Sequence, residues 1–151
     1  CGNRARLPAM TSGLPPIASL LPHAGNMVMP ESVQHFDRER IVCTTARHRS
    51  IDNPLRRAGR LPALCGVEFA AQVMALHGAL RQSPPAALHH GRVVSVRDIV
   101  VGRPFLVDIE GSLVIECRLD AAAADVFSYA FTIEGGGETL LQGRATVMMA
   151  R

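Results

Sequence analysis

The amino-acid sequence predicts an α+β fold in which a curved antiparallel sheet wraps one long, buried helix. Three observations lead to this prediction. Residues 61–80 are apolar on every side of a helix, several strand-like segments follow them, and a second helix of similar length is not indicated. A helix that is apolar all round has to be surrounded by protein or by lipid.

The apolar segment reads LPALCGVEFAAQVMALHGAL, and its strongly polar side chains are Glu68, Gln72 and His77. We expect the helix to begin close to Pro62, because the first helical turn does not use the N–H that proline lacks. It should end before Pro84. Twenty helical residues span roughly 30 Å, which is enough to cross a bilayer. A carboxylate near the middle of the segment and arginines close to both ends favour a buried helix over a membrane span.

Strands are expected on both sides of this helix. They are predicted by alternating apolar residues and by runs of β-branched and aromatic residues between turn signals. Their ranges are 32–36 and 41–47 before the helix, and 92–101, 105–119, 126–134 and 139–149 after it. A glycine run at 135–137 joins the last two as a hairpin. An apolar helix beside one long sheet means that the sheet curls around it, which is the hotdog architecture.

The other segments are expected to be mostly irregular. Residues 1–16 are rich in Pro, Gly and Arg and are predicted to be an irregular N-terminal segment, followed by one hotdog domain over 17–151. Within the domain we expect a short helix at 17–21. A loop is expected at 48–60, where an Asp-Asn-Pro sequence and a glycine disfavour regular structure.

The composition excludes some classes of function. All sixteen basic residues are arginine, so chemistry that needs a lysine amine is excluded. The net charge is +3, but the arginines are scattered and only one Tyr and five Phe are present to stack on bases. We therefore expect no nucleic-acid partner.

The cysteines indicate a reducing compartment. Cys43, Cys65 and Cys117 lie in apolar surroundings, and together with Cys1 they do not have metal-ligand spacing. We interpret these three as free thiols of a cytoplasmic protein. The N-terminal residues do not have the basic and then apolar pattern of a signal peptide, which agrees with that location.

Three motifs resemble the bacterial 3-hydroxyacyl-acyl-carrier-protein dehydratases. LLPHAGNM at 20–27 resembles the opening motif of that family. The stretch 61–72, with Glu68 followed by an Ala-Gln pair, is similar to its active-site helix. Residues 96–105 resemble the strand-turn-strand before its long central strand. GRLPA at 59–63 with GVEFAAQ at 66–72 is most similar to the divergent dehydratase-like proteins of aryl-polyene and related polyketide clusters.

The resemblance implies roles for residues of the helix. In the family a His removes the C2 proton of a 3-hydroxyacyl thioester, and a carboxyl group protonates the departing 3-hydroxyl. Glu68 would be that acid, and backbone N–H groups at the helix N-terminus would polarise the thioester carbonyl. The implied substrate-binding residues are Gln72, Ala63, Leu64, Gly66 and Arg60. The implied substrate is an acyl chain on the phosphopantetheine of acyl carrier protein or CoA, with no cofactor and no metal.

One position departs from the family pattern. Asn53 occupies the place that aligns best with the catalytic His, and Ala63 replaces a glycine of the same motif. Asn cannot abstract a proton, so either another His substitutes or this subunit lacks half of the catalytic pair. Asn53 can still bind the substrate carbonyl or a water, and a turn residue before Pro54 is an equally good interpretation.

Three histidines are candidates for the missing base. His48 precedes Asn53 at the end of a strand and is the best of them. His23 lies in the opening motif, where the family's His is usually structural. His77 is expected to hydrogen-bond a backbone carbonyl, and the pair at positions 89 and 90 reads as surface.

The other candidate residues also have structural interpretations. Glu68 can be a buried carboxylate that pairs with Arg97, and Gln72 can either position Glu68 or bond within the core. Arg60, with Arg56 and Arg57, can face the acidic surface or the phosphate of a carrier protein. Solvated charges are the simpler interpretation of that arginine cluster.

The leading hypothesis is a 3-hydroxyacyl-acyl-carrier-protein dehydratase of fatty-acid or polyene biosynthesis. It would act with acyl carrier protein as a homodimer, or as a heterodimer with a hotdog subunit that carries the His, and without a membrane. Two alternatives stay open. One is a hotdog thioesterase, in which the carboxylate activates water, and the other is a non-catalytic acyl-binding subunit.

Overall fold

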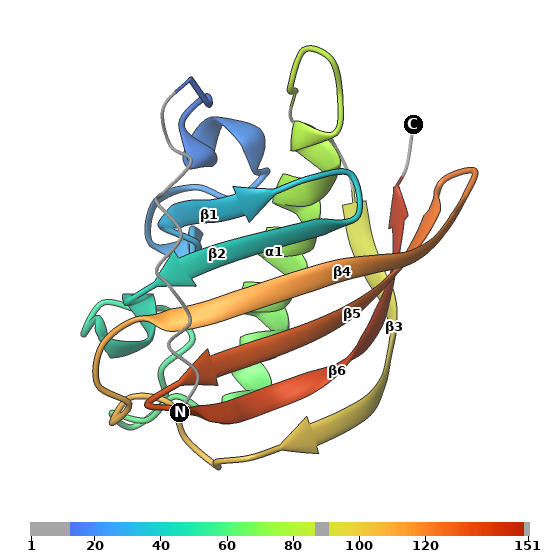
Figure 1. Cartoon of the computed structure of the whole chain (residues 1–151). Coiled ribbons are helices and arrows are strands. Elements are labelled where there is room, and N and C mark those ends of the chain that lie inside the picture. The colour runs from blue at the N-terminus through green and yellow to red at the C-terminus, as the bar shows by residue number, and fades with distance from the viewer. Residues whose placement is uncertain (1–12, 87–90, 150–151) are drawn as a thin grey trace.

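The curved sheet and the single long helix are both present in the structure, a computed structural model that describes residues 13–86 and 91–149. Six antiparallel strands follow the order β1-β2-β4-β5-β6-β3 and curl around helix α1 (Figure 1). The strands are β1 Ser32–Phe36, β2 Arg40–Thr45, β3 Gly91–Val101, β4 Leu113–Ala123, β5 Val126–Gly135 and β6 Glu138–Met149. The predicted hotdog architecture is confirmed.

Helix α1, Gly66–Leu80, follows a 3₁₀ turn, η4, at Ala63–Cys65. The helical conformation therefore begins just after Pro62, as predicted, but its first turn is wound more tightly than an α-helix. At Gly66 a β-carbon would lie 2.8 Å from Ile133 Cδ1 and 2.9 Å from Leu141 Cδ2, so the glycine allows the helix to approach β5 and β6.

The same segment is long and apolar enough to cross a membrane, with a mean hydropathy of 1.4 over Ala63–Leu80. The fold accounts for this composition in another way. Helix α1 packs against β2, β4 and β5 (Figure 1). Most of its apolar side chains are buried in the core. Because the sheet wraps the helix, the helix can be apolar on every side without crossing a membrane.

Two predicted strands have different bounds. The strand expected at 105–119 begins only at Leu113, because residues 105–112 form turns against the segment before the helix. Leu106 N–H donates to Leu61 O at 2.9 Å, and Ile109 N–H donates to Leu106 O at 3.1 Å. The strand expected at 41–47 ends at Thr45, and the 3₁₀ turn η3, Arg47–Arg49, follows it. The short helix expected at 17–21 is the 3₁₀ turn η1, Ile17–Leu20, and a further turn, η2, covers Gly25–Met27.

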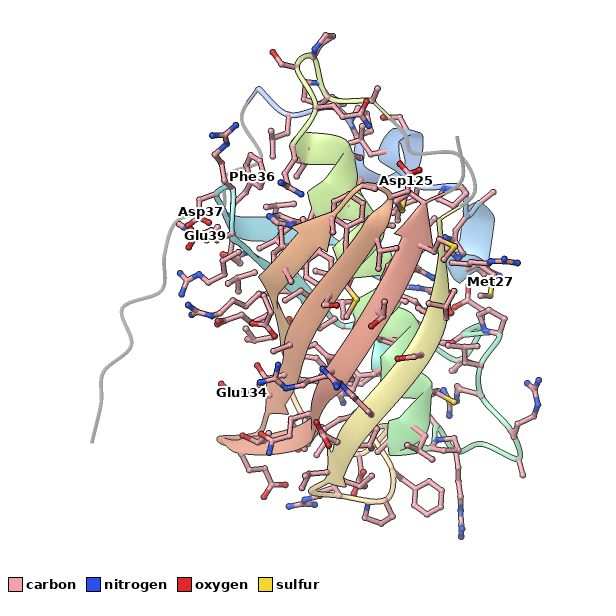
Figure 2. All side chains as sticks on the ribbon, turned by 90° about the vertical axis from the view of Figure 1, so that its right-hand side faces the viewer. Met27, Phe36, Asp37, Glu39, Asp125 and Glu134 are labelled. Atoms are coloured by element: carbon pink, nitrogen blue, oxygen red, sulfur yellow. The ribbon has the colours of Figure 1, made fainter. Side chains whose placement is uncertain are left out.

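His77 lies in the last turn of α1 and is part of a buried polar network. Its Nε2 lies 2.8 Å from Asp37 O, which accepts only, so Nε2 carries the hydrogen. Nδ1 then accepts from the Tyr129 hydroxyl, also at 2.8 Å. Phe36 and Tyr129 pack edge-on against the ring. Figure 2 shows Phe36 and Asp37 together, on the other side of the helix from Met27 in that view. The prediction that His77 bonds a backbone carbonyl is confirmed.

The burial of His48 and His77 predicts a loss of stability in acid. Burial lowers the pKa of both imidazoles from the ordinary value of 6.5. The unfolded chain then binds protons at a higher pH than the folded chain. The stabilising contribution of the neutral rings is therefore complete above that value and is lost as the pH falls below it. We expect the free energy of unfolding in urea to fall between about pH 7.5 and about pH 5.

The test variant is His77→Gln. His35→Gln is its control, because His35 is more exposed and pairs with Asp37 at the surface. We expect His77→Gln to be less stable than the wild type at the higher pH and to lose less stability on acidification. A pH dependence of unchanged size in His77→Gln would contradict the assignment of a buried, neutral ring.

The cysteines are free thiols where the structure describes them. Cys43 and Cys117 are buried, on β2 and β4, and Cys65 is half-buried. Burial raises the pKa of Cys43 to about 12 and that of Cys117 well above its ordinary value, so both thiols stay protonated and unreactive. The prediction of free thiols is confirmed for these three, while Cys1 lies outside the described residues.

Candidate active site

A cavity of about 270 Å³ lies between one face of α1 and the edge strand β3 with its neighbour β6. The helix contributes the carboxylate of Glu68, and the turn between η1 and η2 contributes His23. The residues that line it are Pro22, His23, Glu68, Ala71, Ala75, Gly91, Arg92, Val93, Val147 and Met149. Most of this surface is apolar, so a cavity with one convergent polar pair is suited to a partly apolar ligand.

Glu68 faces this cavity. Its Oε1 lies 3.0 Å from His23 Nε2 and 3.0 Å from Gln72 Nε2. The side chain is 36% exposed, so the expectation of a fully buried carboxylate is wrong for the single chain. In the described part of the chain Glu68 contacts His23 and Gln72, and the alternative pairing with Arg97 is not found.

Gln72 lies one helical turn after Glu68 and has a fixed orientation. Its Oε1 accepts from Met29 N–H at 2.8 Å, and its Nε2 donates to Met27 O at 2.7 Å. The remaining N–H of the amide donates to Glu68. Gln72 therefore bonds within the core and also contacts Glu68. The two interpretations of Gln72 offered by the sequence are compatible with each other.

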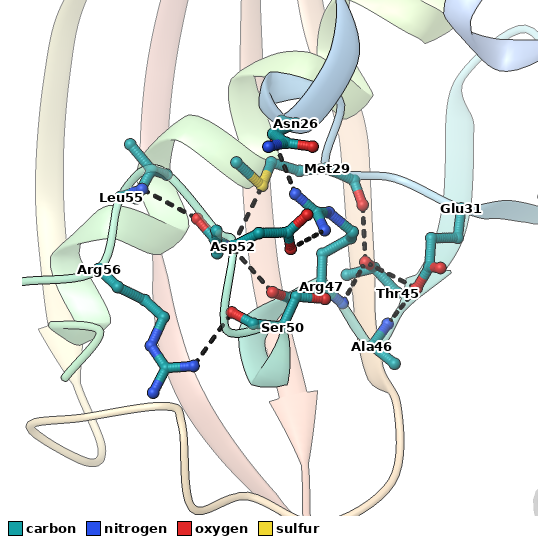
Figure 3. A network of polar contacts seen from close by, with 11 residues as sticks. Asn26, Met29, Glu31, Thr45, Ala46, Arg47, Ser50, Asp52, Leu55 and Arg56 are labelled. Atoms are coloured by element: carbon teal, nitrogen blue, oxygen red, sulfur yellow. Dashed lines mark hydrogen bonds and ion pairs between the residues drawn. The ribbon is translucent and has the colours of Figure 1, made fainter. Parts of the chain in front are cut away.

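Asn53 is not brought to Glu68. Its Nδ2 donates to Arg47 O at 2.8 Å and its Oδ1 accepts from Leu55 N–H at 2.9 Å. The side chain is buried within the loop and does not line the cavity. Figure 3 shows the surrounding network, in which Arg47 also bonds Asp52. The structure supports the interpretation of Asn53 as a turn residue, and its contact with substrate stays a prediction.

His48 is also held away from the cavity. It is fully buried, with Nε2 2.8 Å from Ile109 O, and the expectation that it swings into the site would need that bond to break. His23 is the histidine that lies beside Glu68 instead. The sequence signal for it was the Pro-His step of the opening motif, which we interpreted as structural.

The helix N-terminus does not offer all of the expected donors. Ala63 N–H donates to Pro104 O at 2.9 Å, and Gly66 N–H bonds the carbonyls of Ala63 and Leu64. These two N–H groups are therefore already bonded within the chain in this conformation, and the binding of substrate by Ala63 and Gly66 stays a prediction. Leu64 lies beside them with its side chain 58% exposed.

The arginines before the helix are partly used by their own loop. Arg56 donates to Ser50 O and Gly59 O, and Arg57 donates to Pro54 O. The guanidinium of Arg60 lies 4.9 Å from the centre of the Phe105 ring, a cation–π contact. Contact of these residues with a carrier protein stays a prediction.

A curved antiparallel sheet around one helix defines a hotdog protein, and its candidate site is the cavity beside the helix that the Glu68 carboxylate lines. The chain belongs to the ApeP-like family, whose model, described as ApeP dehydratase, matches residues 15–151. A search of the curated proteins found no match.

Solved structures agree with the fold. The dehydratase heterocomplex ApeI:P from Xenorhabdus doucetiae has a TM-score of 0.81 at 22% identity, over 91% of this chain and 93% of that chain. A homologue of HP0420 from Helicobacter felis has a TM-score of 0.63 at 12% identity, over 94% of each chain. A mutant thioesterase from Pseudomonas aeruginosa has a TM-score of 0.55 at 15% identity, over 79% of this chain and 80% of that chain. At these identities the likeness shows the fold alone.

Proposed function

We propose that this chain is a cytoplasmic dehydratase subunit that eliminates water from a 3-hydroxyacyl group held as a thioester on acyl carrier protein. The observation that carries the proposal is the Glu68 carboxylate, which faces an apolar cavity in a chain of the ApeP-like dehydratase family. Fatty-acid or polyene biosynthesis supplies substrates of this chemistry.

The elimination needs one acid and one base. The C2–H bond breaks and its electron pair forms the C2=C3 double bond. The base accepts the C2 proton, and the C3–O bond breaks as the double bond forms, so that the hydroxyl leaves as water with a proton from the acid. Glu68 is the acid in this proposal, since it is the carboxylate in the cavity. Asn53 cannot serve as the base, and His48 is bonded elsewhere.

We infer that the base comes from a second hotdog subunit. Strand β3 is an edge of the sheet next to the cavity, and its Val94, Val96, Val100 and Val101 are each at least 39% exposed. An apolar edge strand of this kind favours pairing with another chain. The similar dehydratase ApeI:P is a heterocomplex, which supports a partner that differs from this chain. In this proposal that partner carries the His.

The test uses the purified chain alone, and together with a His-bearing hotdog subunit, on 3-hydroxyacyl and saturated acyl carrier-protein thioesters. Mass spectrometry follows both the enoyl product and the free thiol. We expect enoyl product from the 3-hydroxyacyl substrate, and only when both subunits are present. Dehydration at a normal rate by this chain alone would show that the partner is not needed.

A thioesterase is the second candidate, because Glu68 faces the cavity and its Oε2, which neither His23 nor Gln72 contacts, is placed to activate water. Its signature is release of thiol from the saturated acyl substrate without any enoyl product. If neither enoyl product nor free thiol forms, with this chain alone or with both subunits, the remaining candidate is a non-catalytic acyl-binding subunit.

A further inference from the structure

Two N–H donors converge on one oxygen of Glu68. His23 Nε2 and Gln72 Nε2 each lie 3.0 Å from Oε1. The two donors come from segments that are far apart in the sequence, because His23 belongs to the turn before η2 and Gln72 to α1. Oε2 is the carboxylate oxygen that neither bond uses.

The orientation of the Gln72 amide determines that Gln72 donates, and Glu68 accepts, in the hydrogen bond between them. Its carbonyl oxygen is needed as the acceptor for Met29 N–H, and one N–H is needed as the donor to Met27 O. The nitrogen therefore faces Glu68, and Oε1 accepts. A proton on the acid form of Glu68 is then placed on Oε2, the oxygen that remains for the substrate.

His23 also donates a hydrogen bond to Oε1 of Glu68. Its Nδ1 is buried and has no hydrogen-bond partner among the described residues. A neutral ring with its hydrogen on Nε2 donates to Glu68 and leaves only a lone pair at Nδ1. With Nε2 on Glu68 and Nδ1 buried, neither nitrogen is directed to a substrate.

We propose that His23 is a positioning residue which, with Gln72, holds Oε1 of Glu68 so that the acid meets its substrate through Oε2 alone. The inference rests on the proposed dehydration. Without the two donors the carboxyl group can rotate and exchange its oxygens, and a misplaced acid loses much of its effect on the rate. His23 thus acts through Glu68 and is not the missing base.

The test compares His23→Gln with His23→Leu in the complex of this chain with its hotdog partner subunit. Gln keeps an N–H donor at a similar reach, whereas Leu fills similar space without a donor. His35→Leu is the control, because His35 also contacts a carboxylate, that of Asp37, at 2.7 Å but lies outside the cavity.

The first readout is a crystal structure of each variant, which does not depend on activity. We expect Glu68 to keep its position in His23→Gln and in His35→Leu, and to take more than one side-chain conformer in His23→Leu. A single, unchanged Glu68 conformer in His23→Leu would overturn the proposal.

The second readout is the kinetics of enoyl formation. For His23→Leu we expect kcat to fall by about tenfold to a hundredfold with little change in KM. In His23→Gln most of that loss should be recovered. Equal losses in the two His23 variants, with Glu68 in place in both crystals, would also overturn the positioning role. If the wild-type complex forms no enoyl product, the proposed function fails, and the crystal structures still decide the role of His23.

Discussion

Replacement of Glu68 by Gln is expected to lower the rate of enoyl formation by about 10²–10⁴-fold, because the amide cannot give a proton to the departing hydroxyl. Folding should be affected little. Gln has the same shape as Glu, and its Oε1 can still accept from Gln72 at a side chain that is 36% exposed. The measurement is kcat for the two-subunit complex, together with a urea unfolding curve.

The matched control is Glu116→Gln. Glu116 lies on β4, is 31% exposed and contacts the surface side chains of Arg40 and Arg118. This variant should form enoyl product at the wild-type rate. Wild-type activity of Glu68→Gln would show that the acid lies elsewhere. A third outcome is that the wild-type complex forms no enoyl product but releases thiol from a saturated substrate, and that Glu68→Gln loses this release. That outcome would assign Glu68 to hydrolysis instead.

The sequence predicted the fold because the helix and the sheet have strong, separate signals. A helix without a polar side needs cover on every side, and one long sheet supplies it by curving. The error at 105–112 has a physical cause. Leu106 and Ile109 are almost fully buried although they lie in turns, so an alternating apolar pattern reports burial and does not by itself report a strand.

The candidate site was predicted only where its residues share one helix. Glu68 and Gln72 are four positions apart, so helical geometry alone places them together. His23 is 45 positions from Glu68, and no local pattern tells which loop reaches the helix face. Asn53 was selected because it aligns with the catalytic His of the family, and His48 because it precedes Asn53 at the end of a strand. Alignment and order along the chain do not show that their side chains are used by the loop and by Ile109 O.

The packing around the helix can be tested separately from its chemistry. Phe69 follows Glu68 directly but points into the core and is fully buried. We expect Phe69→Ala to lower the free energy of unfolding by about 3–5 kcal/mol, from lost burial and from the cavity that remains. Domains are stable by only about 5–15 kcal/mol, so this variant should be close to unfolding. Urea unfolding measures the loss, with Val114→Ala, at a position 37% exposed, as the control. A loss below about 0.5 kcal/mol, the level of surface substitutions, would mean that the sheet does not enclose the helix.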